Sequence, residues 1–486
     1  RPASAPRAAG SCYVGFADHP RAVAMHWLFS LTPLEHGAFV FVGLLIYVMV
    51  TRIGQQHRHP SAAIAWVMSI ALLPYVGTPL FLIFGTRKLA RARRRFVVRA
   101  PAAVGTEGPE WALTLLAALG VPPPVRNVAI VFQGDGAGAL HELVALIDGA
   151  RERVDLSTFV MADDAVGAAV SGALVRAAAR GVQARVLLDA IGGLRTSRRL
   201  ARELRAGGVR VRWFMPVVRN PVRGRTNLRN HRKLVAVDGE SVWSGGRNLA
   251  AEYFVDAPGR PAWRDLSFVV RGPLAAQAHE TFDHDWAAAW GKSPRAARAT
   301  APPPGGDGGP GAQLVPSGPD HADDTVHALL LASAYHARER ILAVTPYFIP
   351  DDALLAAWCI ACRRGVRLTL IVPQRSNHWM ADWARERALR ALAAAGAQVL
   401  LFPSMIHAKA VVVDRQLALC GSANLDGRSL FVNFELMTAF YGADEIAWLA
   451  AWIDAQAQQS GAYEARAPSW GRDVLEGVVR SVGFQL

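Results

Sequence analysis

Two stretches of the chain repeat one pattern of histidine, lysine, aspartate, glycine and asparagine. The first reads HRKLVAVDGESVWSGGRN from His231, and the second reads HAKAVVVDRQLALCGSAN from His407. Both follow H-x-K-x4-D-x6-G-[GS]-x-N, which gives five equivalent pairs: His231 and His407, Lys233 and Lys409, Asp238 and Asp414, Gly245 and Gly421, Asn248 and Asn424. The chain has 53 lysines and arginines, but only four are lysines. Two of these four occupy equivalent places, which chance does not explain.

These residue types suit phosphoryl chemistry without a metal or another cofactor. Side chains two positions apart on a strand point to the same face, so each histidine should project beside the lysine of its motif. If the two halves pack about a pseudo-twofold axis, both pairs meet in one pocket. One neutral histidine could then attack phosphorus, while the other, protonated, gives its proton to the leaving alkoxide. The lysines and asparagine amides would stabilise charge on the non-bridging oxygens.

The aspartates of the motifs have two interpretations. Each lies at the opposite parity from its histidine, and Asp238 lies in VDGE, a sequence typical of a hairpin turn. A structural role at this turn is as compatible with the sequence as a direct chemical role. We therefore keep Asp238 and Asp414 among the candidate catalytic residues, together with His231, Lys233, His407 and Lys409.

The motifs belong to a longer duplication. RERVDLSTFV at Arg151 matches RERILAVTPYF at Arg338, and ARGVQARVLLD matches RRGVRLTLIVP. Each half alternates short β-branched runs with stretches rich in alanine, leucine and arginine, which predicts α/β domains with a largely parallel sheet. The predicted domains are residues 125–300 and 314–486, and APPPGGDGGPGAQ at 301–313 is the predicted exposed linker.

Two apolar segments precede the duplication. With 52% hydrophobic residues, the composition favours a membrane-associated protein, and residues 34–86 are predicted to form a transmembrane helical hairpin. The segment at 61–85 carries no charge and is long enough to cross a bilayer, which takes about 20 residues. The segment at 34–50 is shorter and is the weaker candidate. Residues 1–33 are predicted to be an unstructured extension in which Met25 is a more natural start than residue 1.

A basic run follows the second apolar segment. Seven basic residues lie between Arg87 and Arg99, within a predicted juxtamembrane segment and linker at residues 87–124. The positive-inside rule places everything after Gly85 on the cytoplasmic side. The formal charge of +14 could attract nucleic acid as well as anionic lipid, so charge alone does not choose the partner.

The doubled motif resembles the phospholipase D superfamily from about Val125 onward and, within it, the bacterial cardiolipin synthases. AIAWVMSIALLPYVGTPLFLIFG, VTPYFIPDD and GSANLDGRSLFVNFE carry the closer similarity. The resemblance implies two tandem phospholipase D-like α/β domains and a phosphohistidine intermediate. It also implies that an acidic residue downstream of each motif orients its histidine, and Asp265 and Glu435 occupy these positions. The phosphate-binding candidates are Gly246, Asn248, Ser422 and Asn424.

The reaction implied by the resemblance is transfer between two phosphatidylglycerol molecules, which gives cardiolipin and glycerol. We assign His231 as the nucleophile and His407 as the general acid, with the reverse kept open. The implied location is the bacterial inner membrane, with several spans and cytoplasmic catalytic domains. The alternatives are a phospholipase D that uses water, transfer to another alcohol, a nuclease of the same superfamily, and a non-catalytic membrane scaffold. The membrane segments argue against nucleic acid as the partner. Nothing in the sequence predicts the oligomeric state.

Three further features bear on a lipid substrate. The loop VVRNPVRGRTNLRN carries four arginines that could meet phosphates or be solvated: Arg219, Arg223, Arg225 and Arg229. Trp379 and Trp383 lie four residues apart on a predicted helix, either in the core or at a membrane interface. Two departures from the family pattern could alter headgroup preference: Gly246, where serine is frequent, and Asn377, where an acidic residue is frequent.

Overall fold

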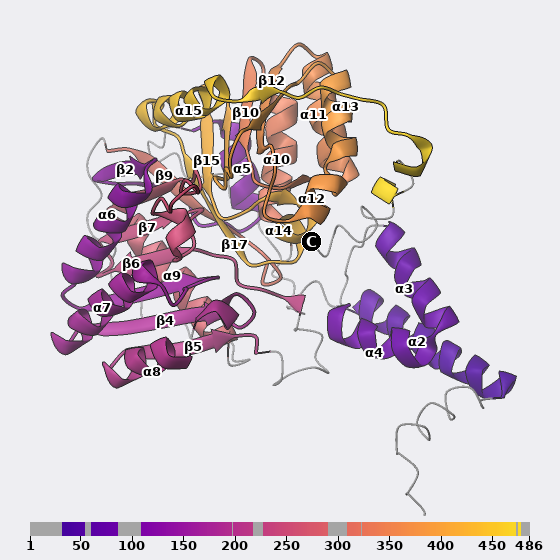
Figure 1. Ribbon diagram of the computed structural model, residues 1–486, viewed down its shortest axis with the longest axis horizontal. Coiled ribbons are helices and arrows are strands. Elements are labelled where there is room, and N and C mark those ends of the chain that lie inside the picture. The colour runs from indigo at the N-terminus through magenta and orange to yellow at the C-terminus, as the bar shows by residue number, and fades with distance from the viewer. Residues whose placement is uncertain are drawn as a thin grey trace, which may run out of the picture. The chain divides into compact units, whose positions relative to one another are not determined.

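The computed structural model describes most of the chain, namely residues 32–53, 60–85, 108–196, 198–216, 227–289, 309–321, 323–472 and 475–477. The chain divides into two compact units, Arg1–Phe81 and Leu82–Leu486 (Figure 1). Several predictions fall outside the described residues: the extension up to residue 31 with Met25, the basic run at Arg87–Arg99, and most of the linker at 301–313.

The N-terminal apolar segments form helices α2 (Pro33–Ile53), α3 (Pro60–Leu72) and α4 (Pro74–Phe84). Within the described residues, one helix, from Pro33 to Thr51, is long and apolar enough to cross a membrane. The segment that we predicted as the stronger span is instead two helices that meet at Leu73. Proline lacks the N–H that would continue α3, and its fixed φ suits the first position of a new helix, which is where Pro74 lies.

Close approach of these helices depends on Gly43 of α2. A Cβ added there would lie 2.4 Å from Oγ1 of Thr78 and 2.8 Å from a methyl carbon of Ile70. Small residues allow such close backbone packing where lipid offers no hydrophobic driving force between helices. The packing of α2 against α3 and α4 therefore leaves no room for a side chain at this position.

The first half of the larger unit builds a seven-stranded sheet in the order β2-β8-β7-β6-β3-β4-β5. Its strands are β2 (Ala129–Gln133), β3 (Arg153–Thr158), β4 (Gln183–Asp189), β5 (Arg210–Phe214), β6 (Leu234–Val237), β7 (Ser241–Gly245) and β8 (Ser267–Arg271). Its helices are α6 (Gly136–Asp148), α7 (Ala165–Ala179), α8 (Arg198–Ala206) and α9 (Leu274–Ala288), with 3-10 turns η1 (Gly192–Arg195) and η4 (Ala251–Tyr253).

The second half builds a nine-stranded sheet in the order β1-β9-β17-β15-β14-β10-β12-β13-β18. Its strands are β9 (Gly311–Ser317), β10 (Arg340–Val344), β12 (Arg367–Pro373), β13 (Gln398–Phe402), β14 (Ala410–Val413), β15 (Leu417–Gly421), β17 (Glu435–Phe440) and β18 (Gly461–Ala462), with β1 (Val125–Arg126) from the first half. A separate pair is β11 (Phe348–Ile349) with β16 (Leu425–Asp426). The helices are α10 (Thr325–His336), α11 (Asp352–Arg363), α12 (Trp379–Ala384), α13 (Glu386–Ala394), α14 (Gly427–Phe431) and α15 (Ala443–Gln458).

The predicted duplication is visible in the strand order, but the sheets are not largely parallel. Strands β3, β4 and β5 run parallel, as do β10, β12 and β13, whereas the other pairs in both sheets are antiparallel. The reason is local: β6 and β7 are joined by a tight turn, and β14 and β15 by another, with no crossover helix between them. Each half is therefore a mixed α/β layer.

The predicted domain boundaries are crossed in three places. Strand β1 pairs with β9, so Val125 belongs to the second sheet, and β9 begins at Gly311 inside the predicted linker. Helix α5 (Glu110–Ala118) lies in the segment predicted as a juxtamembrane linker. Its Ala112 and Leu116 are buried in the core of the second half.

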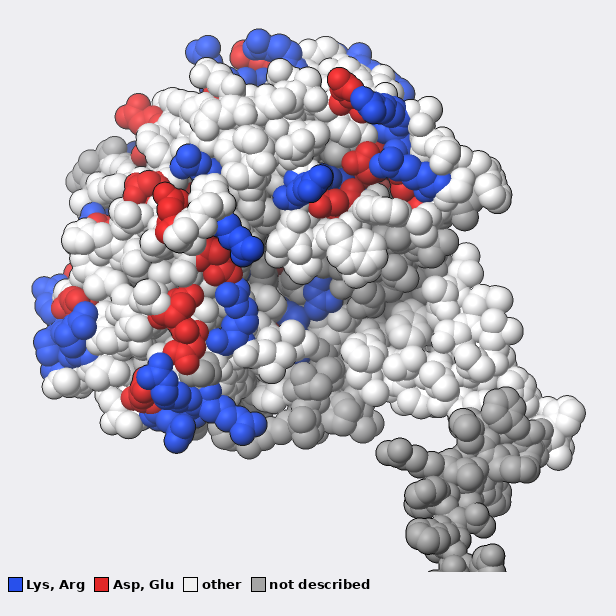
Figure 2. All heavy atoms as spheres, viewed as in Figure 1, with Lys and Arg blue, Asp and Glu red and all other residues white. Residues whose placement is uncertain are grey.

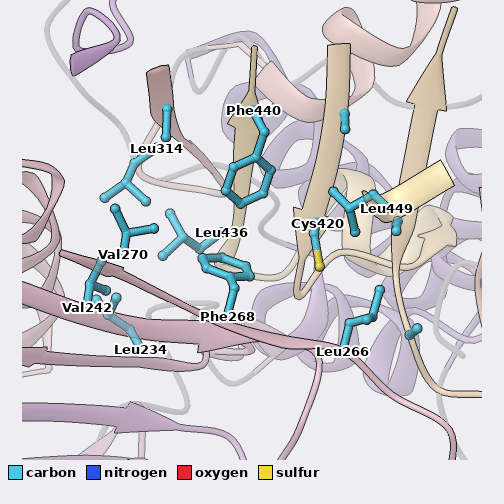
Figure 3. Close-up of a cluster of buried hydrophobic side chains, with 14 of the residues drawn as sticks. Leu234, Val242, Leu266, Phe268, Val270, Leu314, Cys420, Leu436, Phe440 and Leu449 are labelled. Atoms are coloured by element: carbon cyan, nitrogen blue, oxygen red, sulfur yellow. The ribbon is translucent and has the colours of Figure 1, made fainter. Parts of the chain in front are cut away.

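One hydrophobic core joins the two halves. Phe268 of β8 and Phe440 of β17 stack edge to face with ring centroids 5.1 Å apart. Figure 3 shows side chains from both sheets in this cluster, among them Leu234 and Val242 from the first half and Leu436 from the second. The halves are thus packed as one body, which fixes the relative positions of their two motifs.

Candidate active site

Both histidines lie at the same edge of their sheets. Strand β6 is antiparallel to β3, so the beginning of β6 lies beside the end of β3. His231 lies just before β6 and is separated from it by two residues. In the second half, β14 is antiparallel to β10, and His407 precedes β14 in the same way. The carboxyl ends of the parallel strands β3 and β4, and of β10 and β12, share these edges.

The backbone pairs each histidine segment with the other half. The N–H of His231 donates to the carbonyl of Phe434 at 2.9 Å, and the N–H of His407 donates to the carbonyl of Arg264 at 2.6 Å. Phe434 and Arg264 each precede a conspicuous acid, Glu435 and Asp265. The two contacts are reciprocal, as a pseudo-twofold arrangement requires.

The acids accordingly bind the opposite histidines. Nδ1 of His231 lies 3.0 Å from Oε1 of Glu435, and Nδ1 of His407 lies 2.7 Å from Oδ2 of Asp265. The family resemblance implied that each acid would orient the histidine of its own motif. In the structure, each acid instead binds the histidine of the other motif. A carboxylate at Nδ1 favours the proton on that nitrogen, which leaves Nε2 as the reacting nitrogen of either ring.

Both carboxylates are ionised although they are buried. Burial alone would raise the pKa of Glu435, but His231 and Lys233 hold it below its usual value. Burial likewise opposes ionisation of Asp265, and His407 and Lys409 lower its pKa. Each half therefore supplies the negative charge that balances the cationic groups of the other half.

The two acids have different local support. Oγ of Ser422 donates to Oε2 of Glu435 at 2.5 Å and accepts the N–H of Leu436 at 2.9 Å. At the position equivalent to Ser422, Gly246 lies so close to Asp265 that an added Cβ would be 2.2 Å from Oδ1. The shorter aspartate therefore occupies the space that a serine would need. Ser422, predicted to bind phosphate, hydrogen-bonds the acid of its own half, Glu435, which in turn binds His231 of the other half.

The lysines are deeply buried, and burial weakens their hold on a proton. Burial lowers the pKa of Lys233 to about 7 and that of Lys409 to about 8. Nζ of Lys233 donates to the carbonyl of His231 at 2.7 Å. Nζ of Lys409 donates to the carbonyl of His407 and lies 2.8 Å from Nδ1 and 3.0 Å from Nε2 of the same ring, so it rests against the ring.

The surroundings also disfavour a charged imidazole at both histidines. Burial, followed by the charge of Lys409, lowers the pKa of His407 to about 3. Burial lowers the pKa of His231 too, where Glu435 opposes the shift. The charge of Lys233 also acts on His407, and that of Lys409 on His231. The two motifs thus form one electrostatic unit.

The motif asparagines have unused hydrogen-bonding capacity. Asn248 and Asn424 are buried, and Oδ1 of each has no hydrogen-bond partner among the described residues. The amide of Asn248 is 2.8 Å from the hydroxyl of Tyr253, whose ring packs edge to face on His407 at 5.0 Å. Because the O and N atoms of an amide are assigned from their partners, either end of Asn248 can face a bound phosphoryl group.

The two aspartates of the motifs lie away from the histidines, at the opposite ends of strands β6 and β14. Asp238 follows β6 at the end opposite His231, and it accepts the backbone N–H groups of Arg151, Glu152 and Arg153 at 2.8–2.9 Å. Asp414 makes the same three bonds to the residues from Arg338 to Arg340. Their prediction as catalytic residues is corrected in favour of the turn role, because each closes the start of a parallel strand.

Arg229 also has a different role from the one predicted. It is buried, with Nη1 3.4 Å from Oδ1 of Asp189 and Nη2 3.1 Å from the carbonyl of Met215. Its guanidinium is therefore directed into the protein and is almost entirely shielded from solvent. The other three arginines of this loop, Arg219, Arg223 and Arg225, lie outside the described residues.

Two residues that support the histidine segments were not predicted from the sequence. Arg232, which lies between His231 and Lys233 in the sequence, is buried. Tyr253 contacts both Asn248 and His407. Arg232 occupies an unspecified position of the motif, and Tyr253 follows the motif, so no spacing signal marked either. Among the residues that the structure describes, no group of three or more histidine, cysteine or acidic side chains could hold a metal ion.

Comparison with known proteins agrees with this arrangement of two motifs. A family described as "Cardiolipin synthase, PLD-like domain" matches residues 143–286 and 330–456. The chain belongs to this family. A second family, described as "Phospholipase_D-nuclease N-terminal", matches residues 39–85, the region of α2 to α4.

Individual relatives support the assignment over most of the chain. Cardiolipin synthase A of Pseudomonas aeruginosa (strain LESB58) is 33% identical over 442 residues, which cover 86% of this chain and 88% of the relative. Cardiolipin synthase A of Pseudomonas putida is 34% identical over 401 residues, 78% of this chain and 82% of the relative. The predicted superfamily, the enzyme class and the membrane association are confirmed at the level of this family.

A solved structure shows the same fold. The phosphatidylserine synthase of Haemophilus influenzae Rd KW20 superimposes with a TM-score of 0.59 at 15% identity, covering 77% of this chain and 100% of that chain. At this identity the likeness concerns the fold alone. Together with the family match to residues 143–286 and 330–456, it confirms the predicted tandem α/β domains of the phospholipase D type.

Proposed function

We propose that this member of the cardiolipin synthase family transfers a phosphatidyl group from one phosphatidylglycerol to a second, giving cardiolipin and glycerol. One observation carries the proposal: each histidine is bound at Nδ1 by a buried carboxylate of the opposite half, at 3.0 Å for His231 and 2.7 Å for His407. Two imidazoles with Nε2 available, beside two buried lysines, suit a double displacement at phosphorus.

In the first step, Nε2 of His231 attacks the phosphorus of the donor lipid. A P–N bond forms and the bond from phosphorus to the glycerol headgroup oxygen breaks. The leaving alkoxide takes a proton from His407 and departs as glycerol. Lys233, Lys409 and the amides of Asn248 and Asn424 stabilise the charge on the non-bridging oxygens.

In the second step, a headgroup hydroxyl of another phosphatidylglycerol attacks the phosphohistidine. The P–N bond breaks, a new P–O bond forms, and His407 receives the hydroxyl proton that it then returns in the next cycle. Water at the same position would give phosphatidic acid. The acceptor that reaches the intermediate therefore decides between synthesis and hydrolysis.

Exposure and charge distinguish the two histidines. The side chain of His231 is 11% exposed and that of His407 is 5% exposed. Both lysines donate to the carbonyl of their own motif's histidine, but only Lys409 also lies within 3.0 Å of both ring nitrogens of its histidine, His407. We therefore assign the attack to His231. His407 takes up its proton when the phosphate anion of the bound lipid offsets the charge of Lys409.

The proposed location is the bacterial inner membrane, with several spans and the catalytic unit on the cytoplasmic side. Support comes from the long apolar helix α2 and from the seven basic residues between Arg87 and Arg99 in the sequence. A reporter fused after residue 486 tests the sidedness: cytoplasmic activity of the reporter agrees with the proposal, and periplasmic activity contradicts it.

Lipid analysis tests the reaction. Purified protein in phosphatidylglycerol vesicles should release cardiolipin and glycerol in equal amounts, and His231→Ala and His407→Ala should abolish both products. Phosphatidic acid in place of cardiolipin would identify a phospholipase. Absence of turnover with phosphatidylglycerol would reject this lipid as the donor.

Trapping the intermediate tests the order of attack. Protein is incubated with a donor lipid that is radiolabelled at phosphorus and is then denatured in alkali, where the P–N bond of a phosphohistidine survives. The label should be found on His231. Label on His407 alone would reverse the two roles.

A further inference from the structure

Two surface segments beside the active site expose large apolar side chains. Ile191 and Leu194, after β4, are 42% and 82% exposed. Trp379, Met380 and Trp383, on α12, are 65%, 36% and 43% exposed. We call these five residues the apolar rim. Such side chains are unusual on a surface that contacts only water when they gather at one place.

The two segments are related by the duplication. The first follows β4 and the second follows β12, which are equivalent strands of the two sheets. Both strands run parallel to a neighbour, β3 or β10, whose end lies beside a catalytic histidine segment. The apolar rim is therefore contributed by both halves at the sheet edges that hold His231 and His407.

Packing connects each segment to its histidine. A Cβ added to Gly192 would lie 2.0 Å from the carbonyl oxygen of Phe159, and the Phe159 ring packs on His231 at 5.2 Å. The segment with Ile191 and Leu194 is thus separated from His231 by a single aromatic side chain.

The second segment is connected in an equivalent way. The hydroxyl of Tyr347 donates to Oδ1 of Asn377 at 2.5 Å, two residues before α12. Tyr347 follows β10, whose carboxyl end lies beside the beginning of β14 and therefore beside the His407 segment. The hydrogen bond from Tyr347 thus holds the segment before α12 at the sheet edge that carries His407.

Helix α12 has an apolar outer face and no free negative charge. Ala381 and Ala384 pack inward against Ile349, while the two tryptophans and Met380 remain outside. The carboxylate of Asp382 lies 3.0 Å from Arg385. Figure 2 shows a largely uncharged surface over α12, with blue and red side chains beside it.

The charges next to this helix suit an anionic surface. Arg375 precedes α12 and Arg387 follows it, and both side chains are exposed without an ion pair to any described residue. Tryptophan favours the headgroup level of a bilayer, and arginine beside it attracts lipid phosphate at about 1 kcal/mol per residue.

We propose that the apolar rim docks the catalytic unit on the surface of an anionic bilayer, so that a lipid headgroup passes from the membrane to the two histidines without crossing water. The occupant is the bilayer itself, not a second copy of the chain. The inference rests on the proposed lipid substrate for its purpose, but the contact can be measured without catalysis.

Fluorescence quenching tests the contact directly. Full-length protein is placed in phosphatidylglycerol vesicles that contain a lipid brominated near the headgroup end of its chains. Bromine quenches tryptophans at that depth, so the quenched fraction should fall in Trp379→Phe/Trp383→Phe relative to the wild type. An unchanged quenched fraction overturns the proposal, including the case in which a second copy covers these side chains.

Turnover tests the purpose. Protein in inert phosphatidylcholine vesicles receives phosphatidylglycerol either within the bilayer or as a water-soluble short-chain form from outside. Leu194→Ser/Trp379→Ser/Trp383→Ser should release glycerol from the bilayer substrate at least tenfold more slowly than the wild type. With the soluble substrate its rate should stay within twofold.

A matched control uses exposed apolar residues at the opposite edge of the sheets. Val128, before β2, and Tyr335, near the end of α10, are 64% and 53% exposed. Val128→Ser/Tyr335→Ser should keep both rates. Equal losses on both substrates in the rim variant, or no loss on either, overturn the delivery role. If the wild type turns over neither substrate, the proposed function fails, and the quenching result still decides the docking surface.

Discussion

The two catalytic segments each combine an acid, a histidine and a lysine, but different residues support them. In the first segment, Nη1 of the buried Arg232 is 2.5 Å from Asp285, and its Nε is 3.0 Å from the carbonyl of Glu435. In the second, the equivalent residue is Ala408, buried among apolar side chains. The residue after the first histidine thus forms buried ionic contacts, whereas the residue after the second packs in a hydrophobic core.

The difference extends to the rings themselves. His407 is enclosed by Tyr253 and Trp263, with ring centroids 5.0 and 5.6 Å away, and by Lys409. His231 has one aromatic neighbour among the described residues, Phe159, at 5.2 Å. After duplication, each histidine keeps a carboxylate of the other half at Nδ1, and the other residues around the two rings have diverged. Equivalent substitutions should therefore have unequal effects.

The largest asymmetry should appear when each histidine is removed. With phosphatidylglycerol, His231→Ala and His407→Ala should each lower turnover by at least about 10³-fold, because both steps need both rings. A phosphatidyl donor with p-nitrophenolate as leaving group needs no general acid. His407→Ala should then still show a burst of nitrophenolate, which absorbance detects, and His231→Ala should show none. A burst in His231→Ala alone would exchange the roles.

The buried ions should dominate stability only in the first half. Arg232→Met leaves Asp285 and Asp320 without their arginine, and breaking a buried pair costs about 3–5 kcal/mol. Thermal unfolding in detergent should show this loss, and Arg232→Met/Asp285→Asn should recover much of it. Ala408→Ser, at the equivalent place, should cost less than about 3 kcal/mol. Equal losses at the two positions would contradict the comparison.

Much of this site follows from the sequence. Constant spacing of the two motifs gave the histidines, lysines and asparagines, because a duplicated strand carries its side chains to equivalent places. The exchange of Asp265 and Glu435 between the halves did not follow from it. Which acid faces which histidine depends on how two sheets pack, and sequence separation carries no information about that.

The errors in the fold have similar causes. The mixed sheets were not predicted, because tight turns at Asp238 and Asp414 join antiparallel strands where a parallel sheet would need crossover helices. Both aspartates adopt the left-handed conformation of such turns, with φ of 54° and 51°. The second apolar segment was predicted from its length and hydropathy, which are insensitive to the missing N–H of Pro74. The buried role of Arg229 was not predictable from charge, because its partner Asp189 is distant in sequence.

The lysines offer a smaller test of the same comparison. Lys409→Met should raise the pKa of His407 above about 3, because the charge of Lys409 is the main cause of the lowering after burial. Lys233→Met should raise the pKa of His231 less, because the charge of Lys233 is a smaller cause there than that of Glu435, whereas at His407 the charge of Lys409 outweighs that of Asp265. Histidine NMR titrations of the two variants measure both shifts. Equal rises would show that the lysines act alike.

The lowered pKa of His407 also makes the folding stability depend on pH. The unfolded chain binds a proton on His407 near its usual pKa of 6.5, whereas the folded chain binds it near 3. Folding stability therefore falls as the pH drops from 6.5 toward 3. Lys409→Met should reduce this fall, which denaturant unfolding at several pH values would show. A steeper fall in the variant would contradict the assigned cause.

The smallest effects concern the residues behind the acids. Gly246→Ala places a Cβ 2.2 Å from Oδ1 of Asp265, so the acid must move away from His407, and kcat should fall about tenfold. Ser422→Ala removes one hydrogen bond to Glu435, worth about 1 kcal/mol, and should lower kcat about fivefold with KM unchanged. Gly471→Ala, where an added Cβ meets nothing within 4 Å, is the control. A serine that held substrate phosphate would instead change KM, so the split between kcat and KM decides whether Ser422 supports the acid or binds the lipid.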